Sequence, residues 1–247
     1  ADLWPEAVLK ESKTKKEHIT KEIDALETFP FVTIDGEDAK DFDDAIFCEF
    51  SDHGFHLKVA IADVSFYVKE GSALDLEAAK RTTSVYMPKK VVPMLPEKLS
   101  NELCSLQPNK RRRCLCIEMD FDKDGYINSY KFHRGIIKSV ARLTYTEVEN
   151  QLINGVKDSD YAESLKAAIA LFNKLISNKG YRGALDFTIS EPFVQTNSDG
   201  DIKHIADRKR LNSHKLIEEF MLAANISAAD FISQYAKEGV YRIHEHP

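Results

Sequence analysis

The chain has 247 residues, of which 43% are hydrophobic and 30% are charged, and its formal net charge is −6. This length is enough for one large core or two small ones. No apolar run approaches the length of a membrane span and no signal peptide opens the sequence, so we expect a cytoplasmic protein. The negative charge does not exclude a nucleic-acid partner, because phosphate contacts depend on local patches of Lys and Arg.

The cysteines argue against a zinc-binding protein, and two basic runs are candidate contacts to phosphate. The four cysteines lie in or next to apolar runs without C-x-x-C spacing, which is typical of reduced core thiols and not of zinc ligands. Lys, Arg and His side chains gather at residues 110–113 and 203–215. Each basic patch is a candidate phosphate contact, and each also fits a solvated face.

In the first half of the chain, residues 1–30 predict a lead-in segment with some helix. Apolar runs predict strands at 31–34, 45–50 and 55–64. A short helix is expected at 75–81 with Asp75 as its cap. Three prolines within residues 83–96 favour an extended, rigid loop that positions Tyr86. Residues 99–106 predict a helical turn.

In the second half, strict alternation predicts a hairpin of two strands, 114–121 and 126–137, which turns at residues 122–125. A helix at 147–153 is expected to be capped by Thr146, with Glu149 at the capping-box position. Apolar residues at helical spacing predict two longer helices. These helices cover residues 161–176 and 211–235, and a further hairpin between them turns at residues 197–200.

The most informative stretch is residues 32–47, where six acidic side chains lie between two apolar runs. Carboxylates held close together cannot all stay ionised without a counter-charge. Oxygen ligands without His or Cys favour Mg²⁺, Mn²⁺ or Ca²⁺ over Zn²⁺. Asp41, Asp43 and Asp44 form one D-x-D-D run, and Gly36 eases a turn that brings Asp35 back onto it. The stretch therefore predicts a cation-binding loop.

Three interpretations of this cluster compete. A solvated acidic turn is the plainest, but core-like segments on both sides disfavour it. An EF-hand calcium loop counted from Asp41 requires Gly at the sixth place and Glu at the twelfth, where the chain has Ile46 and Asp52. The third is a catalytic cluster that holds Mg²⁺ for in-line attack on a phosphodiester. Asp63, which ends the next strand, is either a hydrogen-bonded strand-end carboxylate or a support for the metal loop.

Residues 33–45, TIDGEDAKDFDDA, resemble the signature of the catalytic domain of the ribonuclease II family, and its ribonuclease R branch most closely. Further segments of the chain are similar to family segments and occur in family order: 59–65, 83–86, 93–101, 141–145 and 214–219. The resemblance implies an α+β fold with a mixed, largely antiparallel sheet and packed helices. Residues 31–247 would form the N-terminal part of that catalytic domain.

The resemblance also implies an activity. Family members hydrolyse single-stranded RNA processively from the 3′ end to nucleoside 5′-monophosphates, and the implied cofactor is Mg²⁺, with Mn²⁺ as a substitute. Asp35, Asp41 and Asp44 match the metal ligands of the family. Asp43 matches the aspartate whose loss most directly stops the reaction, so the four aspartates together form the expected catalytic set.

For RNA binding, the resemblance implies that Tyr86 and Phe187 stack on the terminal base, which suits a non-specific nuclease because every base offers a π face. Without the family, Phe187 fits ordinary core packing. Glu219 is expected to help order the RNA path, and it also fits a solvated helix charge. We expect a monomer that acts on the 3′ end of single-stranded RNA.

The chain departs from the family in one respect. It has no match to the flanking small β-barrel RNA-binding domains, nor to a later segment that carries an arginine near the scissile phosphate. This departure leaves the activity of the chain on its own an open question. The alternative function is a non-catalytic RNA-binding relative that keeps the fold. A small-molecule metal phosphatase is disfavoured, because no D-x-D-x-[TV] motif occurs.

Overall fold

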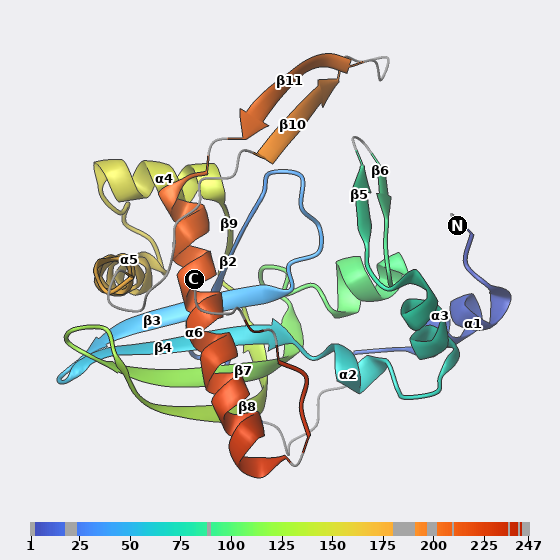
Figure 1. The fold of residues 1–247 in the computed structure, drawn as a ribbon, viewed down its shortest axis with the longest axis horizontal. Helices are drawn as coiled ribbons and strands as arrows, with labels where there is room; N and C mark the ends of the chain where they lie inside the picture. Colours follow the sequence, from blue (N-terminus) through green and yellow to red (C-terminus); the bar gives the residue numbers. More distant parts are fainter. Residues whose placement is uncertain are drawn as a thin grey trace.

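A seven-stranded sheet forms the centre of the protein (Figure 1). The computed structural model describes residues 3–17, 24–87, 90–179, 191–196, 202–208, 210–236, 238–241 and 243. The strand order is β1-β8-β7-β4-β3-β2-β9. The strands are β1 (Asp24–Ala25), β2 (Val32–Asp35), β3 (Asp44–Ser51), β4 (Gly54–Ala62), β7 (Arg111–Asp122), β8 (Ile127–Lys138) and β9 (Ala141–Thr144).

Most neighbouring strands run antiparallel, as expected for an α+β fold. The pairs β1–β8 and β2–β9 are parallel, so the sheet is mixed. The β3–β4 hairpin pairs from Asp44 opposite Ile61 to Ser51 opposite Gly54. Gly54 is required at this turn, because a Cβ there would lie 2.3 Å from the carbonyl oxygen of Phe121 on β7. The prediction of a mixed, largely antiparallel sheet with packed helices is confirmed.

One face of the sheet is covered by three helices, α4 (Tyr145–Asn154), α5 (Ala162–Ser177) and α6 (Asn212–Tyr235). Leu57 and Val59 project from β4 into this core, where they join Leu165 of α5 and Phe220 of α6. The side chains that reach this face alternate along each strand, as a pleated sheet requires. Helix α6 crosses the sheet in Figure 1.

The opposite face packs on helices α1 (Glu6–Thr14), α2 (Val64–Tyr67) and α3 (Ala73–Arg81) and on the π-helical turn η1 (Lys98–Leu103). Its core includes Phe31, Phe47 and Cys116. Val8 of α1 and Leu26, which follows β1, are buried in the same cluster. The described part of the lead-in segment therefore packs against the domain and contributes an edge strand.

Three local predictions are wrong. Residues 83–96 hold a short hairpin, β5 (Val85–Met87) and β6 (Lys90–Val92), because the prolines flank its strands and leave their pairing intact. Helix α3 is capped by Ser72, whose hydroxyl accepts from the Asp75 N–H at 3.3 Å. Helix α4 begins two residues early, because Thr144 and Glu147 form the capping box in place of the same pattern at Thr146 and Glu149.

Other predictions hold. The hairpin of β7 and β8 extends further than predicted, and α5 and α6 lie within one residue of the expected bounds. All four cysteines are buried and free, as predicted for core thiols. A second hairpin, β10 (Glu191–Thr196) and β11 (Ile202–Arg208), forms where one was expected, although its turn lies outside the described residues. In the described part of the chain, none of the helices has the length and apolar composition that crossing a membrane requires.

A core substitution tests the packing between the sheet and helices α4, α5 and α6. Leu57 is fully buried at the centre of β4, so Leu57→Ala should lower the free energy of unfolding by about 2–5 kcal/mol. Leu115→Ala on the neighbouring strand is the matched control, since Leu115 is 38% exposed and should cost clearly less. Urea unfolding of both variants measures the difference, and equal losses would contradict the assigned packing.

Candidate active site at the carboxylate loop

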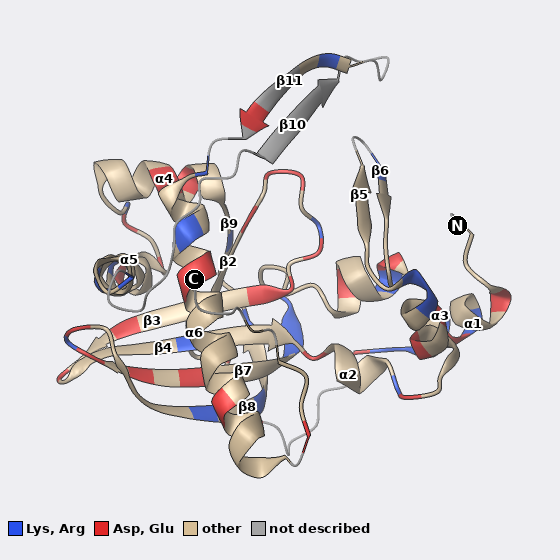
Figure 2. Ribbon diagram, viewed as in Figure 1, with Lys and Arg blue, Asp and Glu red and all other residues tan. Residues whose placement is uncertain are grey.

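The four candidate aspartates lie where β2 ends and β3 begins. Asp35 is the last residue of β2 and Asp44 the first of β3, and Asp41 and Asp43 lie on the connection between them. We call residues 35–44 the carboxylate loop. Figure 2 shows acidic residues along this loop and at the start of β3. Because Val32 pairs with Ile46, the two strands return beside one another and hold both ends of the loop.

One side of the loop is held by the backbone and side chain of the segment after η1. The fully buried Ser105 hydroxyl donates to the Lys40 carbonyl at 2.8 Å and accepts from the Phe42 N–H at 3.1 Å. The Leu106 N–H donates to the Phe42 carbonyl at 2.7 Å. These bonds fix the backbone on both sides of Asp41, so its carboxylate projects from a rigid base.

The other side is held by Arg142 of β9. Because β9 pairs parallel with β2, Arg142 lies opposite Thr33 and its guanidinium reaches over the start of the loop. It donates to the carbonyl of Gly36 and, at 2.8 Å, to that of Glu37. Its carbon Cζ also lies 5.6 Å from the centre of the Phe42 ring. Neither Arg142 nor Ser105 was assigned a role from the sequence, although Arg142 lies in the family-like segment 141–145.

The carboxylates raise one another's pKa. Burial and the charge of Asp43 raise the pKa of Asp35 to about 6, against the lowering effect of Arg142. Burial and the charges of Asp43 and Asp35 raise the pKa of Asp44 to about 7. The pKa of Asp43 is raised by the surrounding protein and by the charge of Asp41, although its side chain reaches the surface. All four therefore share one electrostatic site.

The chemistry of these side chains fits a hard divalent cation. Asp35 Oδ2 and Asp44 Oδ2 are buried without a hydrogen-bond partner among the described residues, a costly state that a bound cation would relieve. Among those residues, no three His, Cys, Asp or Glu side chains are arranged to coordinate one ion as they stand. Cation binding would therefore require the carboxylates to come closer together. Asp35, Asp41 and Asp44 are the residues that would hold the cation.

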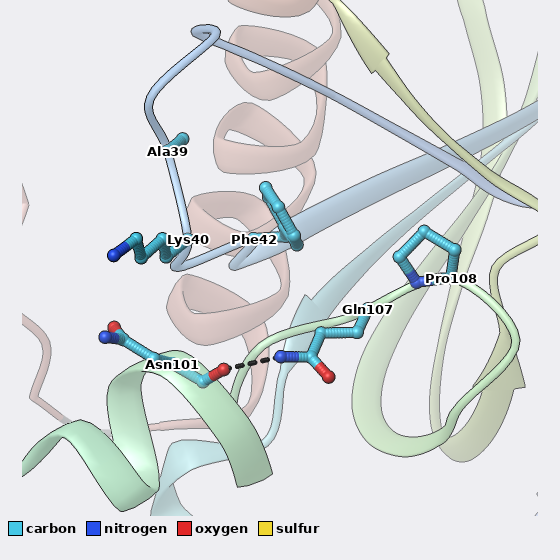
Figure 3. A pocket seen from close by; sticks show the side chains of 6 residues that line it. All are labelled: Ala39, Lys40, Phe42, Asn101, Gln107 and Pro108. Carbon is cyan, nitrogen blue, oxygen red and sulfur yellow. Dashed lines mark hydrogen bonds between the residues drawn. The ribbon is translucent and has the colours of Figure 1, made fainter.

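A pocket of about 400 Å³ opens against the same loop (Figure 3). It is lined by Ala39, Lys40, Phe42, Asn101, Gln107 and Pro108. The Gln107 side chain donates from Nε2 to the Asn101 carbonyl at 2.7 Å, which joins the two walls below the loop. The pocket has no acidic lining, so the cation site is not part of it.

The predicted RNA-binding residues lie in different settings. Tyr86 on β5 is 65% exposed, and its hydroxyl donates to Asp41 Oδ2 at 2.7 Å. Glu219 on α6 is only 2% exposed and lies 3.9 Å from Lys179 Nζ, so it is not a solvated helix charge. Phe187 lies outside the described residues.

The first basic patch, residues 110–113, is half exposed and half buried, with Lys110 and Arg111 at the surface and Arg112 and Arg113 inside. Arg111 binds Glu27 through two hydrogen bonds of 2.6 and 2.9 Å. Arg112 is buried and donates to the carbonyls of Glu102 and Ser105. The Arg113 guanidinium lies over the ring of Phe66, 3.7 Å from its centre. Arg112 and Arg113 are buried and support the fold, whereas Arg111 is paired but exposed.

The second patch is also partly occupied, since Arg210 pairs with Glu218 and His214 stacks on Tyr145 with ring centres 4.0 Å apart. Lys203 and His204 on β11 are exposed. Asp63 is buried and accepts from the Ser65 hydroxyl at 2.9 Å, as the strand-end interpretation predicts. The Ala62 N–H donates to the Asp43 carbonyl at 2.9 Å, so this strand end also supports the loop through its backbone.

The fold agrees with what a comparison with known families finds. The RNB domain family matches residues 23–247. The chain therefore belongs to the RNB domain family.

Proteins named Ribonuclease R are among its most similar relatives. That of Escherichia coli is 43% identical over 255 residues, which cover 99% of this chain and 31% of the relative. That of Thermotoga maritima is 41% identical over 254 residues, which cover 99% of this chain and 36% of the relative. The chain thus spans about a third of the length of these relatives.

Solved structures match as well. Mycoplasma genitalium RNase R in complex with ribose methylated single-stranded RNA has a TM-score of 0.94 and 32% identity, over 100% of this chain and 40% of that one. The same enzyme in complex with double-stranded RNA has a TM-score of 0.90, over 95% of this chain and 43% of that one. The fold is also shared by yeast Ssd1, a pseudonuclease, with a TM-score of 0.65 and 21% identity, over 85% of this chain and 25% of that one.

The raised pKa values give the cation-free protein a distinct pH dependence. The folded state keeps protons on Asp35 and Asp44 up to pH values of about 6 and 7, whereas the unfolded state releases them near pH 4. This contribution to stability is greatest below about pH 4 and is lost as the pH rises through 7. In EDTA, Asp44→Asn should therefore gain stability relative to the wild type as the pH rises over this range.

Urea unfolding across the pH series checks this expectation. Adding Mg²⁺ at neutral pH should stabilise the wild type, because the cation neutralises the ionised carboxylates. It should stabilise Asp44→Asn much less, because this variant lacks one of them. If the free energies of unfolding of the wild type and Asp44→Asn differ by the same amount at every pH, Asp44 does not ionise within a shared site.

Arg142 offers a separate test of how the loop is held. Arg142→Lys keeps the positive charge but removes the guanidinium nitrogen Nη2 that donates to both carbonyls, so the carboxylate loop should open more often. We expect amide hydrogen exchange in residues 36–43 to rise about tenfold or more, as the loss of hydrogen bonds from a charged donor implies. Arg134→Lys is the control, since Arg134 on β8 has a 61% exposed side chain. Equal amide hydrogen exchange in Arg142→Lys and Arg134→Lys would show that Arg142 does not hold the loop closed.

Proposed function

We propose that the protein is a Mg²⁺-dependent exoribonuclease that hydrolyses single-stranded RNA processively from the 3′ end and releases nucleoside 5′-monophosphates. The observation that carries this proposal is the carboxylate loop. Its buried oxygens have no hydrogen-bond partner among the described residues, and these oxygens and the mutually raised pKa values call for a divalent cation. Membership of the RNB domain family supports the same reaction class. Mn²⁺ is the expected substitute for Mg²⁺, and we propose a monomeric, cytoplasmic enzyme.

Each aspartate has a part in this reaction. When bound, a divalent cation supplies a Lewis acid for the phosphate and lowers the pKa of the attacking water. Asp35, Asp41 and Asp44 hold the positive charge at the end of β2 and the start of β3. Asp43, whose side chain reaches the surface, is the member that faces the reacting phosphate and takes up the proton of the attacking water. Ser105 and Arg142 hold the backbone of the loop, so cation binding would have to move the carboxylate side chains but not the chain that carries them.

RNA binding would begin with the exposed ring of Tyr86, which lies directly beside the carboxylate loop. Stacking on the terminal base suits cleavage without base preference and is worth about 1–3 kcal/mol per base. We propose that Phe187 provides the opposing ring. The buried Glu219 on α6 would shape the RNA path. Lys179, which follows α5, lies 3.9 Å from its carboxylate. The relative in complex with ribose methylated single-stranded RNA supports this class of substrate.

A second candidate function is RNA binding without turnover. The similarity of the fold to that of yeast Ssd1, a pseudonuclease, supports considering it. At 21% identity this similarity bears on the fold alone. The four aspartates favour the enzyme, because a purely binding surface for a polyanion gains nothing from a cluster of carboxylates.

The decisive experiment supplies 5′-labelled single-stranded RNA and Mg²⁺ to the natural protein that carries this chain. We expect stepwise shortening to a short end product, abolished by EDTA. Asp43→Asn should slow cleavage by at least about 100-fold, as the loss of a proton-transfer group implies, and should retain RNA binding in a gel-shift assay.

Asp38→Asn is the matched control, because Asp38 lies on the same loop with an exposed side chain. It should cleave at the wild-type rate. Internal cleavage, or undiminished cleavage by Asp43→Asn, would contradict the proposed reaction. RNA binding with no EDTA-sensitive turnover would establish the second candidate.

A further inference from the structure

The hydrogen bond between Tyr86 and Asp41 joins a rigid element to a weakly anchored one. Ser105 fixes the backbone on both sides of Asp41, so the acceptor is held in place. The donor lies on the β5–β6 hairpin, where Val85, Met87 and Val91 are 48%, 44% and 50% exposed. These three described side chains bury little apolar surface, so hydrophobic packing contributes little to holding them against the domain.

The hairpin is anchored mainly at its base. The Met94 N–H donates to the Ser84 hydroxyl at 2.9 Å, and Arg81 Nη1 of α3 donates to the Pro93 carbonyl at 3.2 Å. Further along the hairpin, the Tyr86 hydroxyl reaches Asp41 Oδ2 at 2.7 Å. In Figure 1 the hairpin stands next to the carboxylate loop. The position of the Tyr86 ring therefore depends on the state of the Asp41 carboxylate.

Asp41 is also one of the aspartates that would hold the cation. A cation drawn to this carboxylate withdraws the negative charge that makes it a strong acceptor, so the bond from Tyr86 weakens. The carboxylate of Asp41 also acts on Tyr86, because the hydrogen bond, with burial, raises the pKa of the hydroxyl to about 12.

We propose that the Tyr86 hydroxyl is a positioning group that latches the β5–β6 hairpin onto the cation-free carboxylate loop, and that cation binding at Asp41 releases the hairpin. The released ring of Tyr86 is then free to stack on a nucleobase. Cation binding and RNA binding are thereby coupled, and by linkage the coupling acts equally in both directions. This inference rests on the proposed function, because it takes the cation and the RNA from it.

Tyr86→Phe tests the latch, because it keeps the ring and removes the hydroxyl. Without the competing hydrogen bond, the natural protein in the absence of RNA should bind Mg²⁺ about threefold to tenfold more tightly by calorimetric titration. Amide hydrogen exchange in β5 and β6 should also rise in cation-free Tyr86→Phe. In the wild type, saturating Mg²⁺ should produce the same rise, and in the variant it should add nothing further.

Tyr130→Phe is the matched control, since the Tyr130 hydroxyl makes the same kind of bond to Asp230 between β8 and α6. It should leave both Mg²⁺ affinity and hairpin exchange unchanged. If Mg²⁺ binds the wild type but Tyr86→Phe behaves like Tyr130→Phe, the latch is refuted while the proposed function stands. If the wild type binds no Mg²⁺, the cation site fails, and the proposed function and the latch fail with it.

Discussion

Electrostatic repulsion among four carboxylates is the constraint on which the site depends. Asp35 and Asp44 are partly buried at the ends of β2 and β3, where water screens them poorly. Their pKa values of about 6 and 7 express the cost of charging them in this position. A fold that needed only stability would not place these groups together. The rest of the structure can be understood as the scaffold that holds them in spite of this cost.

That scaffold works through the backbone of the loop and leaves the carboxylates available. Ser105 binds the carbonyl of Lys40 and the N–H of Phe42, and Arg142 binds the carbonyls of Gly36 and Glu37. The loop is thereby fixed without using the oxygens of Asp35 or Asp44. A loop held by salt bridges to its own aspartates would have the same shape but would lose the ligands that a cation needs. The backbone of the loop is therefore rigid, while the oxygens of Asp35 and Asp44 remain available to a cation.

Much of this arrangement follows from the sequence, because strands, hairpin turns and the acidic run are local patterns. The predictions that failed were also local but ambiguous. Residues 144–149 contain two overlapping T-x-x-E patterns, and only the end of β9 decides that Thr144 is the cap. Arg142 and Ser105 could not be assigned from local pattern, since Arg142 depends on parallel pairing with β2 and Ser105 on a contact 63 residues away. Long-range contacts of this kind leave no periodic signal.

The placement of the arginines keeps the carboxylate loop available to a cation. Arg111, Arg112 and Arg113 lie on β7 and neutralise or bind groups away from the loop, among them Glu27 and Glu17. An arginine fixed between two of the loop aspartates would satisfy them permanently and would compete with any divalent ion. Arg142 lowers the pKa of Asp35 from a distance while its hydrogen bonds go to carbonyls. The loop therefore keeps enough positive charge nearby to fold, and too little to replace an exchangeable cation.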